Sequence, residues 1–149
     1  MAKLRGGERL AIALAEIATN LSKPATLRVG FLEGATGPDG DPIAMRAAIN
    51  EFGAPAAGIP PRPFFRNMIA AKSGEWPDAI AGLLKDHNYD AALTLNLAGE
   101  AIASQLQQSI KDTNSPALAP STIERKGFAK PLIETGDMLR AVDHEVKGD

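Results

Sequence analysis

Side chains that could carry chemistry are few in this sequence and lie far apart. There are two histidines, His87 and His144, and no cysteine, which excludes disulfides, thiolate metal sites and cysteine nucleophiles. The nucleophile elbow G-x-S-x-G, the phosphate-binding P-loop and the H-E-x-x-H pair are all absent. We therefore expect a protein that is not an enzyme and needs no cofactor or metal. Structural or surface roles are expected for both histidines, His87 near a helix end and His144 on a strand.

Acidic side chains offer two weaker candidates for a site. The loop from Glu33 to Asp41 is acidic, but it lacks the D-x-[DN]-x-[DN]-G register and the distal glutamate of a calcium-binding EF-hand loop. We interpret it as a turn. Glu100, on an expected helix, and Glu134, just before Thr135, are the carboxylates that a hydrolase would have to use. We interpret both as solvated residues.

Composition is that of a globular protein with long loops. Of 149 residues, 44% are hydrophobic and 23% are charged, which suits a single domain covering residues 1–149. The net charge is −2 and the pI is about 5.7, so no general attraction to a nucleic-acid backbone is expected. No apolar run approaches the ~20 residues of a membrane span. The 14 glycines and 11 prolines outnumber five phenylalanines, one tyrosine and one tryptophan, which favours a thin core stabilised by neighbouring subunits.

Hydrophobic spacing predicts mostly helices with two strands. The first helix carries an apolar stripe at Leu10, Leu14, Ile17 and Leu21, and Pro24 forbids its continuation. We expect an α+β fold, with helices packed on a small antiparallel sheet. The expected helices after the first are Pro42–Phe52, Pro63–Lys72, Trp76–Leu84 and Ala91–Asp112, with a short one that begins at the Ser121–Glu124 capping box and stops at Gly127, and one turn after Thr135. The expected strands are Thr26–Leu32 and Ala141–Val146.

Local signals within these elements predict caps and close approaches. Asp90 is expected to cap the longest helix, and Asp41 with Pro42 to begin the second. Gly53 is expected to end that second helix. Ala98 and Gly99, in the apolar stripe of the longest helix, would let another backbone come close.

Two proline-rich arms are candidate interfaces. In the first arm, Pro60 to Arg66, basic residues stand beside aromatic ones, a composition typical of interface hot spots. The second arm, Asn114 to Pro131, is long for a compact domain, which suggests that a partner uses it. The candidate interface residues are Arg62, Pro63, Phe64, Arg66, Arg125, Lys126, Gly127, Thr135 and Gly136.

Adjacent phenylalanines in the first arm should have different roles. On a helix start, Phe64 and Phe65 diverge by about 100° and cannot both face one core. We expect Phe65, with Met68 and Ile69, to belong to the core. Phe64, with Arg62 or Arg66, is then expected to anchor a partner.

Two longer stretches are more specific than composition. Ile49 to Ile69 reads INEFGAPAAGIPPRPFFRNMI, and Ser115 to Val142 reads SPALAPSTIERKGFAKPLIETGDMLRAV. In order and spacing they resemble the N-E-F-G…I-P-x-R-P-F-F-R and S-P-x-T-I-x-x-K-G…P-L-I-x-T-G-x-M-L stretches of tailed-phage morphogenesis proteins. Those families are described as minor tail protein Z-like, HK97 gene-product-10-like and tail-completion proteins. The resemblance runs from Val29 to Val142.

The resemblance implies a non-enzymatic virion protein of the head–tail junction or the head-proximal tail end. Such a subunit forms a ring, commonly a hexamer, that completes or terminates the tail and supports its joining to the head. The implied partners are other copies of the chain, the tail-tube protein and the neck or head-completion proteins, with DNA only as the genome passing through the channel. No membrane is implied. The ring would assemble in the host cytoplasm and remain in the virion.

Other functions stay open at this point. The chain could serve at another station of the same particle, as a head-closure protein, a minor tail component or an assembly factor. A small nucleic-acid-associated module is a further alternative, and the low pI argues against it.

Overall fold

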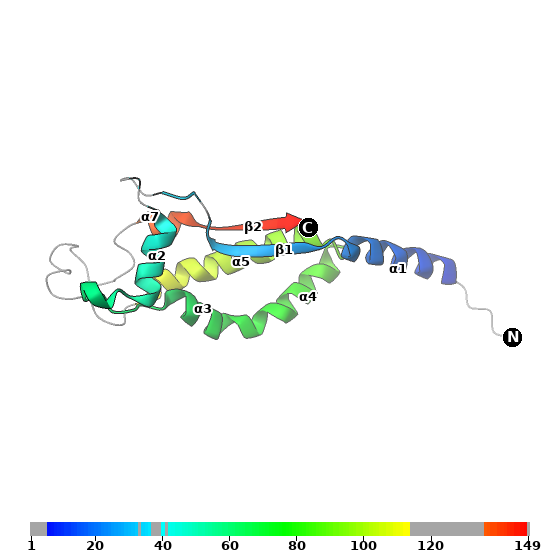
Figure 1. Ribbon diagram of the computed structural model, residues 1–149. Helices are drawn as coiled ribbons and strands as arrows, with labels where there is room; N and C mark the ends of the chain where they lie inside the picture. Colours follow the sequence, from blue (N-terminus) through cyan, green and yellow to red (C-terminus); the bar gives the residue numbers. More distant parts are fainter. Residues whose placement is uncertain (1–5, 33, 37–39, 41, 114–135, 149) are drawn as a thin grey trace.

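The computed structural model describes residues 6–32, 34–36, 40, 42–113 and 136–148. Helices and strands follow one another in an α+β arrangement, in which the five described α-helices after the first pack against a two-stranded antiparallel sheet (Figure 1). The fold class expected from the sequence is therefore confirmed. The elements are α1 (Gly7–Ser22), β1 (Ala25–Phe31), α2 (Ile43–Phe52), α3 (Phe64–Lys72), α4 (Trp76–Asp86), α5 (Ala91–Asp112), α7 (Gly136–Ala141) and β2 (Val142–Gly148).

The sheet pairs a strand near the start of the described chain with the strand at its end. β1 pairs with β2 in a register that runs from Ala25 opposite Gly148 to Phe31 opposite Val142. Both strands were expected, and both are confirmed. A two-stranded sheet is marginal by itself, and here α5 packs against both strands.

A glycine on α5 allows this close packing. Gly99 is buried, and a Cβ placed on it would lie 2.7 Å from Cγ of His144 on β2 and 2.8 Å from Cδ1 of Leu27 on β1. Real Cβ atoms do not come so close to other atoms. The sequence predicted the close approach of another backbone at this point, and the structure instead places side chains of both strands there.

The core lies between α5, the sheet, α3 and α2. Helix α5 contributes Ile102, Leu106 and Ile110 at i, i+4 and i+8, which is one face of a helix. The other buried members of the same cluster are Ile43, Ala47, Phe64, Met68, Met138 and Val142.

Most expected helix ends are confirmed. Asp90 caps α5, because its Oδ1 accepts a hydrogen bond of 3.1 Å from the backbone N–H of Leu93. Gly53 ends α2 with φ 75°, a value that favours glycine. The expected cap at Asp41 and the short helix at Ser121–Glu124 lie outside the described residues.

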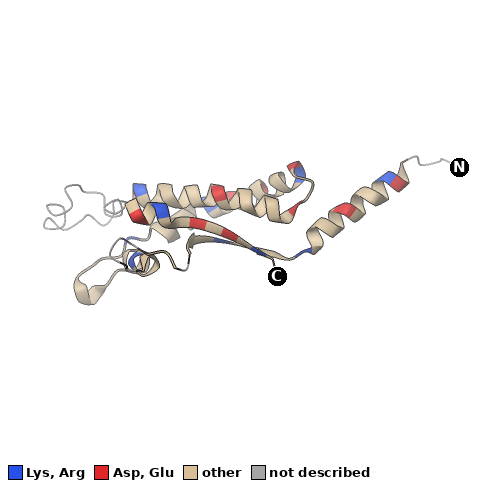
Figure 2. Ribbon diagram, turned by 90° about the horizontal axis from the view of Figure 1, so that it is seen from above, with Lys and Arg blue, Asp and Glu red and all other residues tan. Residues whose placement is uncertain are grey.

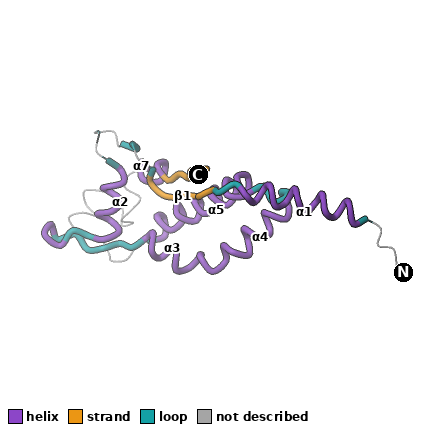
Figure 3. The backbone as a smooth tube through the Cα atoms, turned by 45° about the vertical axis from the view of Figure 1, so that its right-hand side comes forward, coloured by secondary structure: helices purple, strands orange, loops and turns teal. Residues whose placement is uncertain are grey.

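Helix α1 projects away from the remaining elements (Figures 1 and 3). It contains no buried residue. Its base is tied to the turn between α4 and α5, where Asn20 Nδ2 donates a hydrogen bond of 2.9 Å to the backbone oxygen of Asn88. The apolar stripe predicted from the sequence is therefore helical, and the fold leaves it in solvent.

Candidate functional site: the clasp and groove between α2 and α3

A buried carboxylate joins α2 to α3. The side chain of Glu51, near the end of α2, is 7% exposed. Its two oxygens accept hydrogen bonds from the backbone N–H groups of Phe65 (2.9 Å) and Arg66 (3.2 Å) in the first turn of α3. These groups have no partner within the helix, so Glu51 caps α3 from a distance of 14 residues in sequence.

Arg66 closes the same junction from the solvent side. Its Nε donates to Glu51 Oε1 at 2.8 Å, and its Nη2 donates to the backbone oxygen of Glu51 at 3.0 Å. The guanidinium carbon also lies 5.2 Å from the centre of the Phe52 ring, a cation–π arrangement. We call Glu51, Phe52 and Arg66 the clasp.

The loop between the two helices folds back within the same chain. The N–H of Arg62 donates to the backbone oxygen of Asn50 at 2.6 Å, and Ala54 pairs with Ile59 in an isolated bridge. Gly53 is required at the turn, because a Cβ there would lie 2.7 Å from the backbone oxygen of Ile59. The N-E-F-G and R-P-F-F-R motifs are therefore two halves of one structural unit.

Arg62 is a buried cation. The residue is 6% exposed, and its Nε has no hydrogen-bond partner among the described residues. The guanidinium makes one long contact, from Nη1 to the backbone oxygen of Pro60 at 3.5 Å. Burial lowers the pKa of Arg62 from its ordinary value, because the charged form loses hydration.

The expectation that Phe65 belongs to the core while Phe64 anchors a partner is wrong. Phe64 is 1% exposed and packs edge-on against Phe31, with ring centroids 6.1 Å apart. Phe65 is half-buried, and Ile69 is exposed. The Glu51 hydrogen bonds fix the rotation of α3, so that Phe64 and Met68 face the core together. Phe64 therefore cannot anchor a partner without leaving the core, and Arg62 is likewise enclosed by its own domain.

The remaining candidate interface residues lie at different places. Arg66 is the exposed residue among the four candidates of the first arm, with its side chain 58% in solvent. Pro63 is half-buried before α3, and Gly136 begins α7, where a Cβ would crowd the guanidinium of Arg140. Arg125, Lys126, Gly127 and Thr135 lie outside the described residues.

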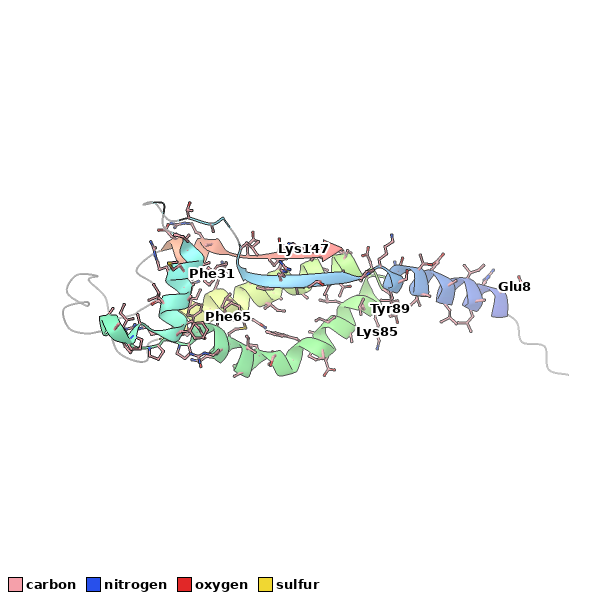
Figure 4. All side chains as sticks on the ribbon, in the orientation of Figure 1. Glu8, Phe31, Phe65, Lys85, Tyr89 and Lys147 are labelled. Atoms are coloured by element: carbon pink, nitrogen blue, oxygen red, sulfur yellow. The ribbon has the colours of Figure 1, made fainter. Side chains whose placement is uncertain are left out.

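Next to the clasp, an apolar groove opens on the surface. It has a volume of about 290 Å³. Figure 4 shows Phe31 and Phe65, two of its lining residues, at the end of the molecule away from α1. Ala44 and Ala48, one turn apart on α2, form another part of its wall, and Phe52 also lines it. Sequence reasoning missed this groove. The sequence feature that could have indicated it is the set of alanines on α2, because small side chains leave space on the surface of a helix.

Exposed apolar side chains gather at the two ends of the molecule. Among the described residues, nine large hydrophobic side chains are exposed, and eight of them lie on α1, α2 or α3. They are Leu10, Ile12, Leu14, Leu21, Met45, Ile49, Phe52 and Ile69. Figure 2 shows acidic and basic residues distributed along the described elements. The exposed apolar side chains on α1, α2 and α3 are therefore suited to contact apolar side chains of another macromolecule.

No arrangement for chemistry stands out in the part of the chain that the structure describes. No group of three or more His, Cys, Asp or Glu residues there could hold a metal ion. His144 packs over Gly99 with its side chain 16% exposed, and His87 is the residue after α4. None of the described helices is long and apolar enough to span a membrane.

Comparisons with known proteins add no relative. No protein-family model, no curated protein and no solved structure matches this chain.

Proposed function

We propose that this chain is a non-enzymatic structural protein of a tailed-phage virion, located at the head–tail junction or the head-proximal end of the tail. It forms an oligomeric ring, a hexamer in the simplest case, that completes or terminates the tail and supports its joining to the head. Its partners are other copies of itself, the tail-tube protein and the proteins of the neck.

The observation that carries the proposal is the placement of exposed apolar side chains. A monomeric protein rarely leaves contiguous apolar surface in water unless a partner covers it. Here such surface lies on α1 at one end of the molecule and on α2 and α3 at the other. A ring subunit needs two different, complementary patches, because each copy contacts two neighbours through different faces.

The sequence motifs support the same proposal. The N-E-F-G and R-P-F-F-R stretches that resemble phage morphogenesis proteins meet in the clasp, where Glu51 caps α3 and Gly53 makes the turn. These residues hold α2 and α3 together beside the groove. A motif with this role belongs to a building block that presents a surface, whereas a catalytic motif would bring reactive groups together.

Deletion of the gene from the phage genome that encodes it tests the function. We expect lysates that contain filled heads and separate tails, visible by electron microscopy, and few joined particles. Supplying the intact gene from a plasmid should restore joined particles. A deletion strain that produces joined, infectious particles at the normal yield would overturn the proposal.

Labelling of purified particles tests the location. An antibody raised against the chain should bind at the neck or the head-proximal tail end. Binding at the distal tail tip, or absence of the chain from finished particles, would contradict the proposed station.

A further inference from the structure

The apolar stripe of α1 is uncovered in its own chain. Leu10, Leu14 and Leu21 are 57%, 56% and 47% exposed. Together with Ile17 they recur every three or four residues, so they form one continuous face of the helix. The helix is about 24 Å long at ~1.5 Å per residue.

A second uncovered apolar surface lies beside α2. The groove is lined by Ala44, Ala48, Phe52 and Phe65. Because the side chains of Ala44 and Ala48 are small, another helix could approach the backbone of α2 closely there. Met45 and Ile49, both exposed, precede Phe52 by seven and three positions, so the three side chains form one apolar face of α2.

These two surfaces cannot meet within one chain. Between them runs β1, seven residues long, which spans roughly 23 Å at ~3.3 Å per residue. Figure 4 shows Glu8 on α1 at one end of the molecule and Phe65 toward the opposite end. Because α1 points away from the groove, only the α1 of another molecule can reach it.

The charges of the two surfaces are complementary. Helix α1 carries two acidic residues, Glu8 and Glu16, and one basic residue, Arg9. The segment 43–72, which builds the groove and its surroundings, carries four basic residues and one acidic residue. Glu51 and Arg66 pair with each other and Arg62 is buried, so Arg46 and Lys72 carry the remaining positive charge of this segment. The fields therefore favour contact between α1 and the groove over contact between two α1 helices.

We infer that α1 of one copy lies in the α2–α3 groove of the next copy, with Leu10, Leu14 and Leu21 against Ala44, Ala48 and Phe52. This inference rests on the proposed ring-forming function and assigns the contact that would build the ring. The contact joins different faces of identical chains, so it repeats from copy to copy and closes when the rotation between copies closes.

Disulfide cross-linking tests the contact directly, because the chain has no cysteine of its own. One preparation carries Leu14→Cys and a second carries Ala48→Cys, and the two are mixed under a mild oxidant. In the matched control, an Ile12→Cys preparation is mixed with the Ala48→Cys preparation. Residue 12 is two positions from residue 14 and faces the opposite side of α1. We expect at least tenfold more covalent heterodimer with Leu14→Cys than with Ile12→Cys.

Three outcomes of this experiment would overturn the inference. Equal yields from the two α1 positions would show that α1 has no preferred face in the contact. Covalent dimers formed by the Leu14→Cys preparation alone, in excess of the heterodimer, would show that α1 pairs with another α1. No cross-link at protein concentrations where the chain self-associates would show that a different surface makes the contact.

A non-covalent test uses sedimentation of the full chain. The double variant Leu10→Glu, Leu14→Glu changes only side chains that project from the body, so circular dichroism should show the same folded state. We expect the dissociation constant of its self-association to rise by about 100-fold, because each of the two leucines lost from an apolar contact contributes about tenfold. The exposed Ile12→Glu is the control and should weaken it far less.

The outcome separates this contact from the proposed function. If the double variant self-associates like the wild type, the α1 contact is wrong, whereas the ring and its place in the virion are still tested by the gene deletion. If the double variant loses self-association but the deletion strain makes normal particles, the contact stands and the proposed function is wrong.

Discussion

Replacing Glu51 by alanine removes the group that joins α2 to α3. The carboxylate accepts two backbone hydrogen bonds, from Phe65 and Arg66, and one from the Arg66 guanidinium. Alanine leaves both backbone N–H groups of α3 without that acceptor. The substitution should therefore lower the free energy of unfolding more than the loss of a surface ion pair would.

The magnitude follows from the separate contributions. Loss of a helix cap costs about 1 kcal/mol, with a range of about 0.5–2 kcal/mol. Loss of the ion pair adds about 0–1 kcal/mol, because the Arg66 side chain is 58% exposed and solvent screens it. The cap value already includes the N–H groups left without an acceptor, and Glu51 serves two of them, so the upper end of that range, about 2 kcal/mol, applies. We expect about 2–3 kcal/mol for Glu51→Ala, and about half of that for Glu51→Gln, which retains one acceptor oxygen.

Urea unfolding followed by circular dichroism measures this difference. The thermal midpoint of Glu51→Ala should fall by about 4–12 °C, at ~2–4 °C per kcal/mol for a chain of this size. Glu100→Ala is the matched control, because Glu100 is an exposed glutamate on α5, and it should change stability by less than about 0.5 kcal/mol. If Arg66→Ala costs as much as Glu51→Ala, the ion pair rather than the cap holds the clasp, and the reasoning is refuted.

Three further predictions concern packing and function. Phe64→Ala should cost about 3–5 kcal/mol in urea unfolding, because the ring is buried; Phe65→Ala should cost less than half as much, and equal costs would contradict the assigned rotation of α3. Gly99→Ala should cost about 1–3 kcal/mol through crowding against His144, and the double variant Gly99→Ala, His144→Ala should recover part of it; an unchanged loss in the double variant would place the strain elsewhere. Glu100→Ala should leave the yield of joined particles unchanged, and a folded variant that abolishes particles would reopen the question of an enzyme.

Much of the fold was predictable because its signals are local. Asp90 before α5, Gly53 after α2 and Pro24 after α1 act within a few residues, so their consequences can be derived without knowing the neighbours. The alternation of Leu27, Val29 and Phe31 likewise reports one covered face of a strand. The pairing of β1 with β2 joins segments more than 100 residues apart, and the sequence predicted both strands without predicting that they pair with each other.

Sequence reasoning singled out the segment 60–66 but not the groove beside it. The segment 60–66 does lie beside the exposed groove, yet Arg62 and Phe64 are turned inward. The sequence shows that two adjacent phenylalanines point in different directions, but not which of them faces the core. That choice depends on Glu51, which sets the rotation of α3 through hydrogen bonds across 14 and 15 positions. Such a contact leaves no periodic signal.

The contrast between α1 and α5 shows what an apolar stripe can and cannot say. Both helices carry apolar residues at helical spacing, but the stripe of α5 is buried and that of α1 is exposed. The difference arises at Pro24, which ends α1 and starts a strand leading away from it, so that α1 cannot fold back onto the sheet. Hydrophobic spacing therefore predicts that a helix has an apolar face to bury, but it does not tell whether the same chain or another molecule buries it. Where the chain's own topology keeps a stripe out of its core, as at Leu10 and Leu14, the same spacing becomes a signal for contact between molecules.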